Sequence, residues 1–441
     1  MTLSENEYRV LNVLLKDPSL SYTEIAQILN LSVTSIRNLL FSLMDYTPTS
    51  SIEDDDSTPV STKDSYINPE PKKNNHLNFF AKFNFDLLNL KRFDFFITCS
   101  TIEQMKNVKN FCLAHPYTNF RSTIHGGKSG IYVLFTMPPE ILDMLIFALE
   151  ALKREHLIDD YKQLIKETNF TIFSLLKIDV FDVNQNRWNF DFDTFKENFH
   201  HYESKSNSNN YFKKTQGKSI LSKFDKIDVI ILNEWGYGAG TRKTKAELLN
   251  NITTFPIYSN YIKDLKLNRY IISDHVDFLQ KETIIKDIGI GFDRKKIQIL
   301  TTLFYLGEAK VEFLNNFANF IQSDEFPFES TLSVGDLNSE SKIAKYTWWV
   351  NFTADNISEF TEFLFENSFY LQTFIVILNS GTMENYPLYH ANFIIDSSNT
   401  GHWNTTEDSC LLMPLKPFFD SSKTQSLIKD YQKVQMSSKK N

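Results

Sequence analysis

An alternation of strands and helices occurs twice in this sequence, and this repetition constrains the fold more than any other feature. Residues 93–180 alternate as strand, helix, strand, strand, helix and strand, and a similar order returns over residues 297–378. The βαββαβ order is typical of ferredoxin-like domains. A chain of 441 residues is too long for one ordinary domain. We therefore expect an α+β fold with tandem ferredoxin-like domains at residues 90–182 and 294–396.

A short motif recurs inside the two segments. The sequence FRSTIHGG at residues 120–127 corresponds to FESTLSVG at 328–335, and VLFT at 133–136 corresponds to VNFT at 350–353. Coincidence is the alternative in a chain with 39 phenylalanines, but the motifs agree in order and in context. We interpret the chain as an internal duplication that places two copies of one module in tandem.

Residues 1–48 are predicted to form three helices. Pro18 ends the first helix because proline cannot continue a helical hydrogen-bond ladder. Ser21 and Glu24 have the spacing of a capping box that opens a short second helix. After a turn at Asn30, Ser32 is placed to cap a third helix. Short helices joined in this way predict a helix-turn-helix.

The third helix carries the candidate DNA-binding residues. Ile36 and Leu40 are expected to face the core, which leaves the polar positions outward. Arg37 suits the O6 and N7 atoms of guanine, Asn38 suits the N6 and N7 atoms of adenine, and hydroxyls near a helix N-terminus suit phosphates. The candidates are Ser32, Thr34, Ser35, Arg37, Asn38 and Ser42. The alternative is a protein-interaction module with a solvated polar face, which the slight excess of acidic residues over residues 1–46 favours.

The regions between these modules are assigned from composition. Residues 49–78 and 183–221 are polar and are predicted to be flexible linkers. Residues 222–293 have a helical pattern with a second capping box at Thr244, which predicts a degenerate winged helix. Residues 397–441 are expected to be a C-terminal extension and tail, with a short helix at most in the last twenty residues.

A basic turn precedes that second capping box. The sequence GYGAGTRKT at residues 236–244 is only faintly similar to a phosphate-binding loop, because Arg242 replaces the glycine required before Lys-Thr. Contacts with the DNA backbone through Arg242, Lys243 and Lys245 are one interpretation of this turn. A plain solvated turn is the other.

The sequence SYTEIAQILNLSVTSIRNLLFSL, within residues 4–44, resembles the winged-helix N-terminus of archaeal regulators of the leucine-responsive regulatory protein (Lrp/AsnC) kind. The βαββαβ repeats resemble the effector domain of that family, which is related to ACT domains and is also called the RAM domain. The resemblance implies a transcription regulator that binds double-stranded DNA, dimerises through its α/β domains and binds small, amino-acid-like effectors near loops between subunits. A duplicated chain is then expected to be a homodimer or a pseudo-symmetric monomer.

Glycine-containing loops are the candidate effector site. Glycine lets backbone amides approach a carboxylate closely. The candidates are His125, Gly126, Gly127, Gly130 and Gly335. Ordinary tight hairpins are the alternative.

Several functional classes lack support in the sequence. The three cysteines form no CxxC pair, and no histidines or carboxylates stand at metal-ligand spacing, so we expect no metal and no disulfide framework. No catalytic motif is found, and we expect neither enzymatic activity nor a cofactor. No apolar stretch reaches the length of a membrane span, and a cytoplasmic location is expected. The net charge of −8 predicts modest, salt-sensitive DNA affinity. An interaction scaffold that kept the architecture of a regulator is the alternative function.

Overall fold

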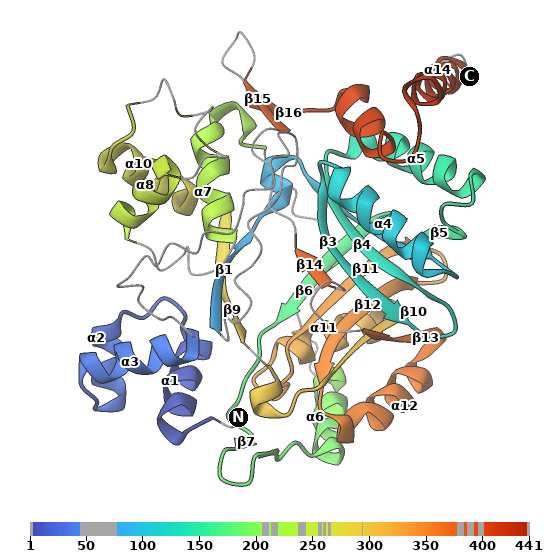
Figure 1. Cartoon of the computed structure of the whole chain (residues 1–441). Coiled ribbons are helices and arrows are strands. Elements are labelled where there is room, and N and C mark those ends of the chain that lie inside the picture. Colours follow the sequence, from blue (N-terminus) through green and yellow to red (C-terminus); the bar gives the residue numbers. More distant parts are fainter. Residues whose placement is uncertain are drawn as a thin grey trace.

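The computed structural model describes residues 3–44, 77–204, 211–212, 219–236, 244–254, 258, 262, 266–292, 294–376, 383–385, 392–395 and 401–438. The fold is α+β, with an N-terminal helical unit and a large antiparallel sheet, as the sequence predicts (Figure 1). Within the described residues no helix is both long enough and apolar enough to span a bilayer. We call residues 3–204 the N-half and residues 219–438 the C-half.

The N-half contains one βαββαβ module. Its sheet has the order β5-β2-β4-β3, and helices α4 and α5 cover one face of it. A short strand, β1, and a 3-10 turn precede the module. In chain order the elements are β1 (Leu77–Phe83), η1 (Phe85–Leu88), β2 (Lys91–Thr98), α4 (Ile102–Ala114), β3 (Thr118–His125), β4 (Ser129–Met137), η2 (Pro139–Ile141), α5 (Leu142–Arg154) and β5 (Asp160–Gln163).

The C-half repeats this order of elements. Its sheet has the order β13-β10-β12-β11, and α11 and α12 cover it. A left-handed residue follows the 3-10 turn in both halves, Asn89 with φ 53° and Gln298 with φ 60°. The elements are β9 (Ile285–Phe292), η5 (Arg294–Ile297), β10 (Thr301–Lys310), α11 (Val311–Gln322), β11 (Ser330–Asn338), β12 (Ile343–Phe352), η6 (Ala354–Asn356), α12 (Ile357–Asn367) and β13 (Ser368–Val376).

The two sheets join into one continuous sheet. At one junction β13 pairs with β3, and at the other β6 (Thr168–Ser174) pairs with β11. Because β6 follows β5 after residues 164–167, the two ends of the strand order are linked by the chain itself. Aromatic rings fill the space between the facing sheets, and Tyr132 lies 5.0 Å from Phe304 and 5.6 Å from Trp349 between ring centroids.

Each half lends its last elements to the other. After β6, helix α6 (Phe192–Ser204) packs on α11 of the C-half. In return, β14 (Met383–Asn385) pairs with β3 of the N-half. The prediction of a flexible linker at residues 183–221 is therefore wrong over α6. Asp193, Thr194 and Glu197 of this helix are exposed, while Phe192, Phe195 and Phe199 are buried against the C-half.

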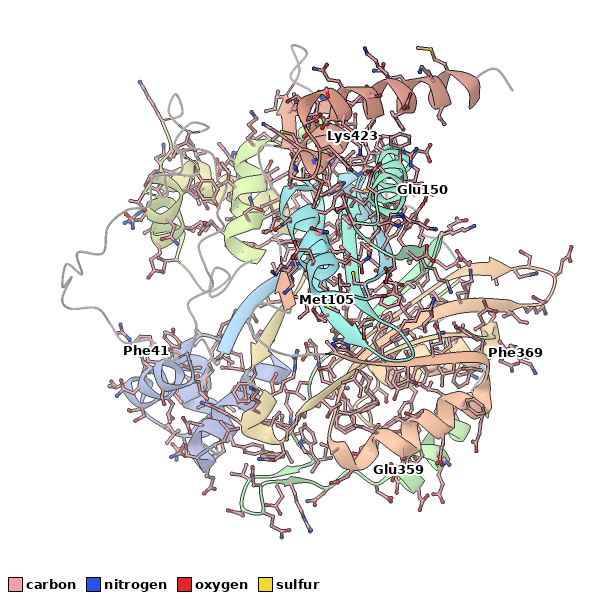
Figure 2. All side chains as sticks on the ribbon, turned by 45° about the vertical axis from the view of Figure 1, so that its right-hand side comes forward. Phe41, Met105, Glu150, Glu359, Phe369 and Lys423 are labelled. Carbon is pink, nitrogen blue, oxygen red and sulfur yellow. The ribbon has the colours of Figure 1, made fainter. Side chains whose placement is uncertain are left out.

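The C-terminal region also crosses to the N-half. It contains β15 (Phe393–Ile395), β16 (Gly401–Trp403), the π-helix η8 (Asp408–Leu412), α13 (Met413–Leu415) and α14 (Ser421–Ser438). Helix α13 contacts α4, and α14 lies against α5, as the neighbourhood of Lys423 and Glu150 in Figure 2 shows. Tyr431 stacks edge-on with Phe147 at 5.4 Å between ring centroids, and Lys423 pairs with Glu155 at 2.6 Å. The prediction of a short helix at most in the last twenty residues is wrong, because α14 spans most of them and packs on η8 and α5.

Two helical units lie beside the sheet, with the ribbon β1–β9 between them (Figure 1). Unit 1 consists of α1 (Glu5–Lys16), α2 (Tyr22–Leu29) and α3 (Val33–Met44). Unit 2 includes α7 (Lys226–Gly236), α8 (Lys245–Thr254) and α10 (Arg269–Lys281). The ribbon strands come from different halves, and unit 1 contacts both strands while α7 contacts β1. β1 begins inside the predicted linker at residues 49–78, so that boundary is wrong by the first two residues of the strand.

The repeated motif is out of register by one residue in its first part. Phe120 faces the space between the sheets and lies 5.4 Å from the Trp349 ring, whereas Phe328 faces the helices of the C-half and lies 5.2 Å from the Phe352 ring. A shift of one residue moves a strand side chain to the opposite face. The strand pairing makes Gly126 the structural counterpart of Gly335, because Arg121 pairs with Val133 as Ser330 pairs with Val350.

Candidate DNA interface

Local capping sets the geometry of unit 1. Ser4 with Glu7 and Ser21 with Glu24 each form a complete capping box at a helix start. Asn30 ends α2 in the left-handed conformation with φ 52°, which asparagine tolerates better than most residues. The amides of Asn30 and Leu31 close this end of the helix onto the α2 carbonyls. The turn between α2 and α3 therefore contains only residues 30–32.

Helix α3 separates an apolar face from a polar one. Ile36, Leu40 and Leu43 are at most 1 % exposed. The side chains of Thr34, Arg37 and Asn38 are exposed. The Arg37 guanidinium lies over the Phe41 ring, 5.2 Å from its centroid. Figure 2 shows Phe41 on the side of unit 1 that is remote from the sheet.

Three of the predicted DNA-binding residues have intramolecular partners. The Ser35 amide donates to the Ser32 hydroxyl at 3.0 Å, and the two hydroxyls lie 2.8 Å apart. These serines therefore cap α3. The Ser42 hydroxyl donates to Glu7 Oε1 at 3.2 Å, which ties α3 to α1. The structure thus brings Thr34, Arg37 and Asn38 together on the open face and gives the serines packing roles that helical periodicity alone does not reveal.

Polar contacts of α1 attach unit 1 to the rest of the N-half. Lys16 Nζ lies 2.7 Å from Asp179 Oδ1, and Asn12 donates to the same oxygen at 3.0 Å. The Tyr8 hydroxyl donates to the Ile178 carbonyl at 3.0 Å. Burial acts to raise the pKa of Asp179, but the hydrogen bonds from Lys16 and Asn12 outweigh it and hold that pKa below its usual value. These contacts of α1 orient unit 1.

Of the three basic residues predicted to contact DNA at this turn, only Lys245 lies within the described residues. Arg242 and Lys243 lie outside the described residues. Lys245, the first residue of α8, donates to the Ser273 hydroxyl and lies 3.5 Å from Asp277 Oδ1. Its charge is thus directed at α10 and not at a ligand.

The glycine loops are filled by protein atoms. A Cβ on Gly126 would lie 2.7 Å from the Phe374 ring and 2.8 Å from the Thr373 carbonyl oxygen. A Cβ on Gly335 would meet the Glu167 carbonyl oxygen, and one on Gly130 would meet the Ile97 carbonyl oxygen. These glycines permit close approach of neighbouring strands, and Gly126 and Gly335 do so at the two junctions between the halves.

Two loop residues differ from these glycines. Around Gly127 there is open space. His125 Nδ1 lies 2.8 Å from the Ser129 hydroxyl and so closes the hairpin. Two surface depressions of about 360 and 480 Å³ are found in the described part of the molecule, and none of the five predicted effector residues lines either.

One cluster in unit 2 has no clear signal in the sequence. His275 Nδ1 lies 2.7 Å from Asp228 Oδ1, and His275 Nε2 lies 3.8 Å from Asp225 Oδ2. Asp228 Oδ2 accepts the Asp225 amide, and Asp225 Oδ1 accepts the amides of Ile227 and Asp228. The cluster caps α7 and fastens it to α10. Since most of its oxygens already accept hydrogen bonds, we interpret it as structural and not as a metal site.

Residues 3–45 match a family described as winged helix-turn-helix DNA-binding. No curated protein matches the chain. Among solved structures, the siroheme decarboxylase NirDL covers 84 % of this chain and 91 % of its own at 10 % identity, with a TM-score of 0.43. A structure of PH0061 covers 38 % of this chain and 95 % of its own at 19 % identity, with a TM-score of 0.24. Likeness at these levels carries no functional argument. The N-terminal unit is thus a winged helix-turn-helix DNA-binding domain.

Proposed function

We propose that this protein is a sequence-specific transcription regulator that reads the major groove of double-stranded DNA with α3, and that it is not an enzyme. The observation that carries the proposal is the open face of α3, where Thr34, Arg37 and Asn38 are exposed above a buried apolar face. A recognition helix needs this division of its faces, together with a short turn from the preceding helix.

The chemistry of the open face suits base edges. An arginine offers two donors to guanine O6 and N7, and an asparagine pairs with adenine N6 and N7. The Phe41 ring beneath Arg37 limits the conformations of its long side chain, which reduces the entropy lost on binding. Thr34 lies one turn before Arg37 and Asn38 and so belongs to the same helical surface.

The test is selection of a binding site from a random duplex pool, followed by fluorescence anisotropy on the selected site. Affinity is expected to fall about tenfold or more between about 50 and 200 mM salt. Arg37→Ala should weaken binding about 5- to 150-fold and relax the preference at one base pair. Lys106→Ala is the matched loss of one exposed positive charge, on α4 of the sheet domain, and should leave binding unchanged.

An interaction scaffold is the alternative function. It is favoured by the net charge of −8 and by exposed aromatic side chains where α12 meets β13, since exposed apolar patches often mark protein interfaces. Phe365 is 71 % exposed and Phe369 is 63 % exposed, and Figure 2 shows Phe369 at the rim of the molecule remote from unit 1. Failure to bind DNA even at low salt would favour this alternative.

A small amino-acid-like effector stays a prediction from the resemblance. Gly126, Gly130 and Gly335 face protein atoms on the side where a Cβ would project. The proposed function therefore rests on DNA binding alone.

A further inference from the structure

Helices α3 and α10 correspond residue by residue. Each has a capping side chain at its start, and the buried positions follow with identical spacing in the two helices. The equivalent pairs are Ser32 with Asn268, Ile36 with Ile272, Leu40 with Val276 and Leu43 with Leu279. This register shows which residues of α10 occupy the positions that read DNA in α3.

Two of the three reading positions of α10 carry chemistry that does not suit DNA, while Tyr270 stands in place of Thr34. Ser273 stands in place of Arg37, and Asp274 in place of Asn38. Asp277 stands in place of Phe41, so the exposed face has gained two carboxylates. Carboxylates repel phosphates, and in the major groove they can accept hydrogen bonds only from the amino groups of cytosine N4 and adenine N6.

Ser273 and Asp277 are also occupied within unit 2. Lys245 donates to the Ser273 hydroxyl and lies 3.5 Å from Asp277. The charge of this lysine is thus directed at the protein itself. Asp274 remains exposed beside it.

We propose that each chain reads a single DNA element through α3 alone, and that unit 2 makes no base contacts. The inference rests on the proposed function and adds that one chain recognises one DNA element. The core of the molecule is built as two similar halves, yet its DNA site lacks two-fold symmetry within the footprint of one chain. An ordinary dimeric regulator instead reads two half-sites about one helical turn apart.

The test is the stoichiometry of binding on DNA selected from a random pool by the full chain. Titration of duplex with protein well above the dissociation constant, followed by sedimentation, should count one chain for each recognition element. A selected palindrome that binds two chains would also agree, because each α3 would then occupy one half-site. A palindrome whose two half-sites are covered by one chain would overturn the inference.

A matched pair of substitutions at equivalent positions identifies the reading helix. Asn38→Ala should weaken binding about 5- to 150-fold, whereas Asp274→Ala should change affinity less than about twofold and leave the selected sequence the same. Both residues are exposed, and circular dichroism checks that both variants remain folded. A change of the selected sequence in Asp274→Ala would overturn the inference, while the absence of any DNA binding by the native chain would overturn the proposed function itself.

Discussion

Replacing Phe195 by alanine removes the central ring through which α6 is anchored on the C-half. Phe195 is 2 % exposed, and its ring lies 4.9 Å from Phe320, 4.8 Å from Phe360 and 5.2 Å from Phe363 between centroids. Two of these contacts are with α12 and one is with α11. The substitution therefore leaves a cavity at a three-helix junction and not at a surface that can relax.

The expected cost follows from the burial. Truncation of a buried phenylalanine to alanine costs about 3 to 5 kcal/mol, because transfer free energy is lost and the cavity is not refilled. This is a large part of the about 5 to 15 kcal/mol that stabilises an ordinary folded domain. Glu197→Ala on the exposed side of the same helix is the control and should change stability by less than about 0.5 kcal/mol.

Urea denaturation, followed by circular dichroism and by tryptophan fluorescence, measures the difference. A lower midpoint for Phe195→Ala is expected in both signals, since α6 is part of the C-half core. If the two variants unfolded at the same urea concentration, α6 would not be packed and residues 183–221 would behave as a linker after all.

Three further outcomes are expected. Gly335→Ala should destabilise the fold by about 1 to 3 kcal/mol in urea denaturation, because the added Cβ meets backbone at a junction between the halves. Gly127→Ala, which has open space around it, should be neutral or slightly stabilising. Equal effects of the two substitutions on stability would contradict the packing role of Gly335. Burial raises the pKa of Asp94, so its ionisation opposes folding as pH rises above about 4. Asp94→Asn should therefore gain stability over the native chain between about pH 4 and pH 7. A difference in unfolding free energy between the two chains that stays constant over this range would refute the reasoning. Burial lowers the pKa of His275, but Asp228 and the neighbouring carboxylates outweigh it and raise that pKa. The stabilisation of the fold by protonated His275 is therefore complete below about pH 6.5 and is lost as pH rises through the raised pKa. In His275→Gln, the melting temperature should lose this pH dependence.

The elements that the sequence predicts well are those fixed by neighbours in the chain. The capping box of Ser21 and Glu24, the turn at Asn30 and the buried face of α3 all depend on residues a few positions apart. Helical periodicity is enough to place Arg37 and Asn38 on the outer face. The same local reasoning applies to the strand and helix order of both halves.

The features that could not be predicted depend on distant partners. The phenylalanines of α6 look isolated in a polar segment because the rings they contact lie more than 100 residues later in the chain. Ser42 looks like a DNA contact until Glu7 of α1 is placed beside it. The mismatch between Phe120 and Phe328 arises because sequence similarity does not report which face of a strand a residue occupies.

The exchange of segments between the halves has a consequence for synthesis of the chain on the ribosome. Strand β3 has its outer partners in β13 and β14, and α4 and α5 are covered by residues 408–438. At about 5 to 20 residues per second, these partners follow β3 by about 15 to 60 s. During that interval the nascent N-half presents an unpaired strand edge and an uncovered helical surface, both of which favour aggregation. The N-half is therefore expected to be prone to aggregation until the C-half has been synthesised.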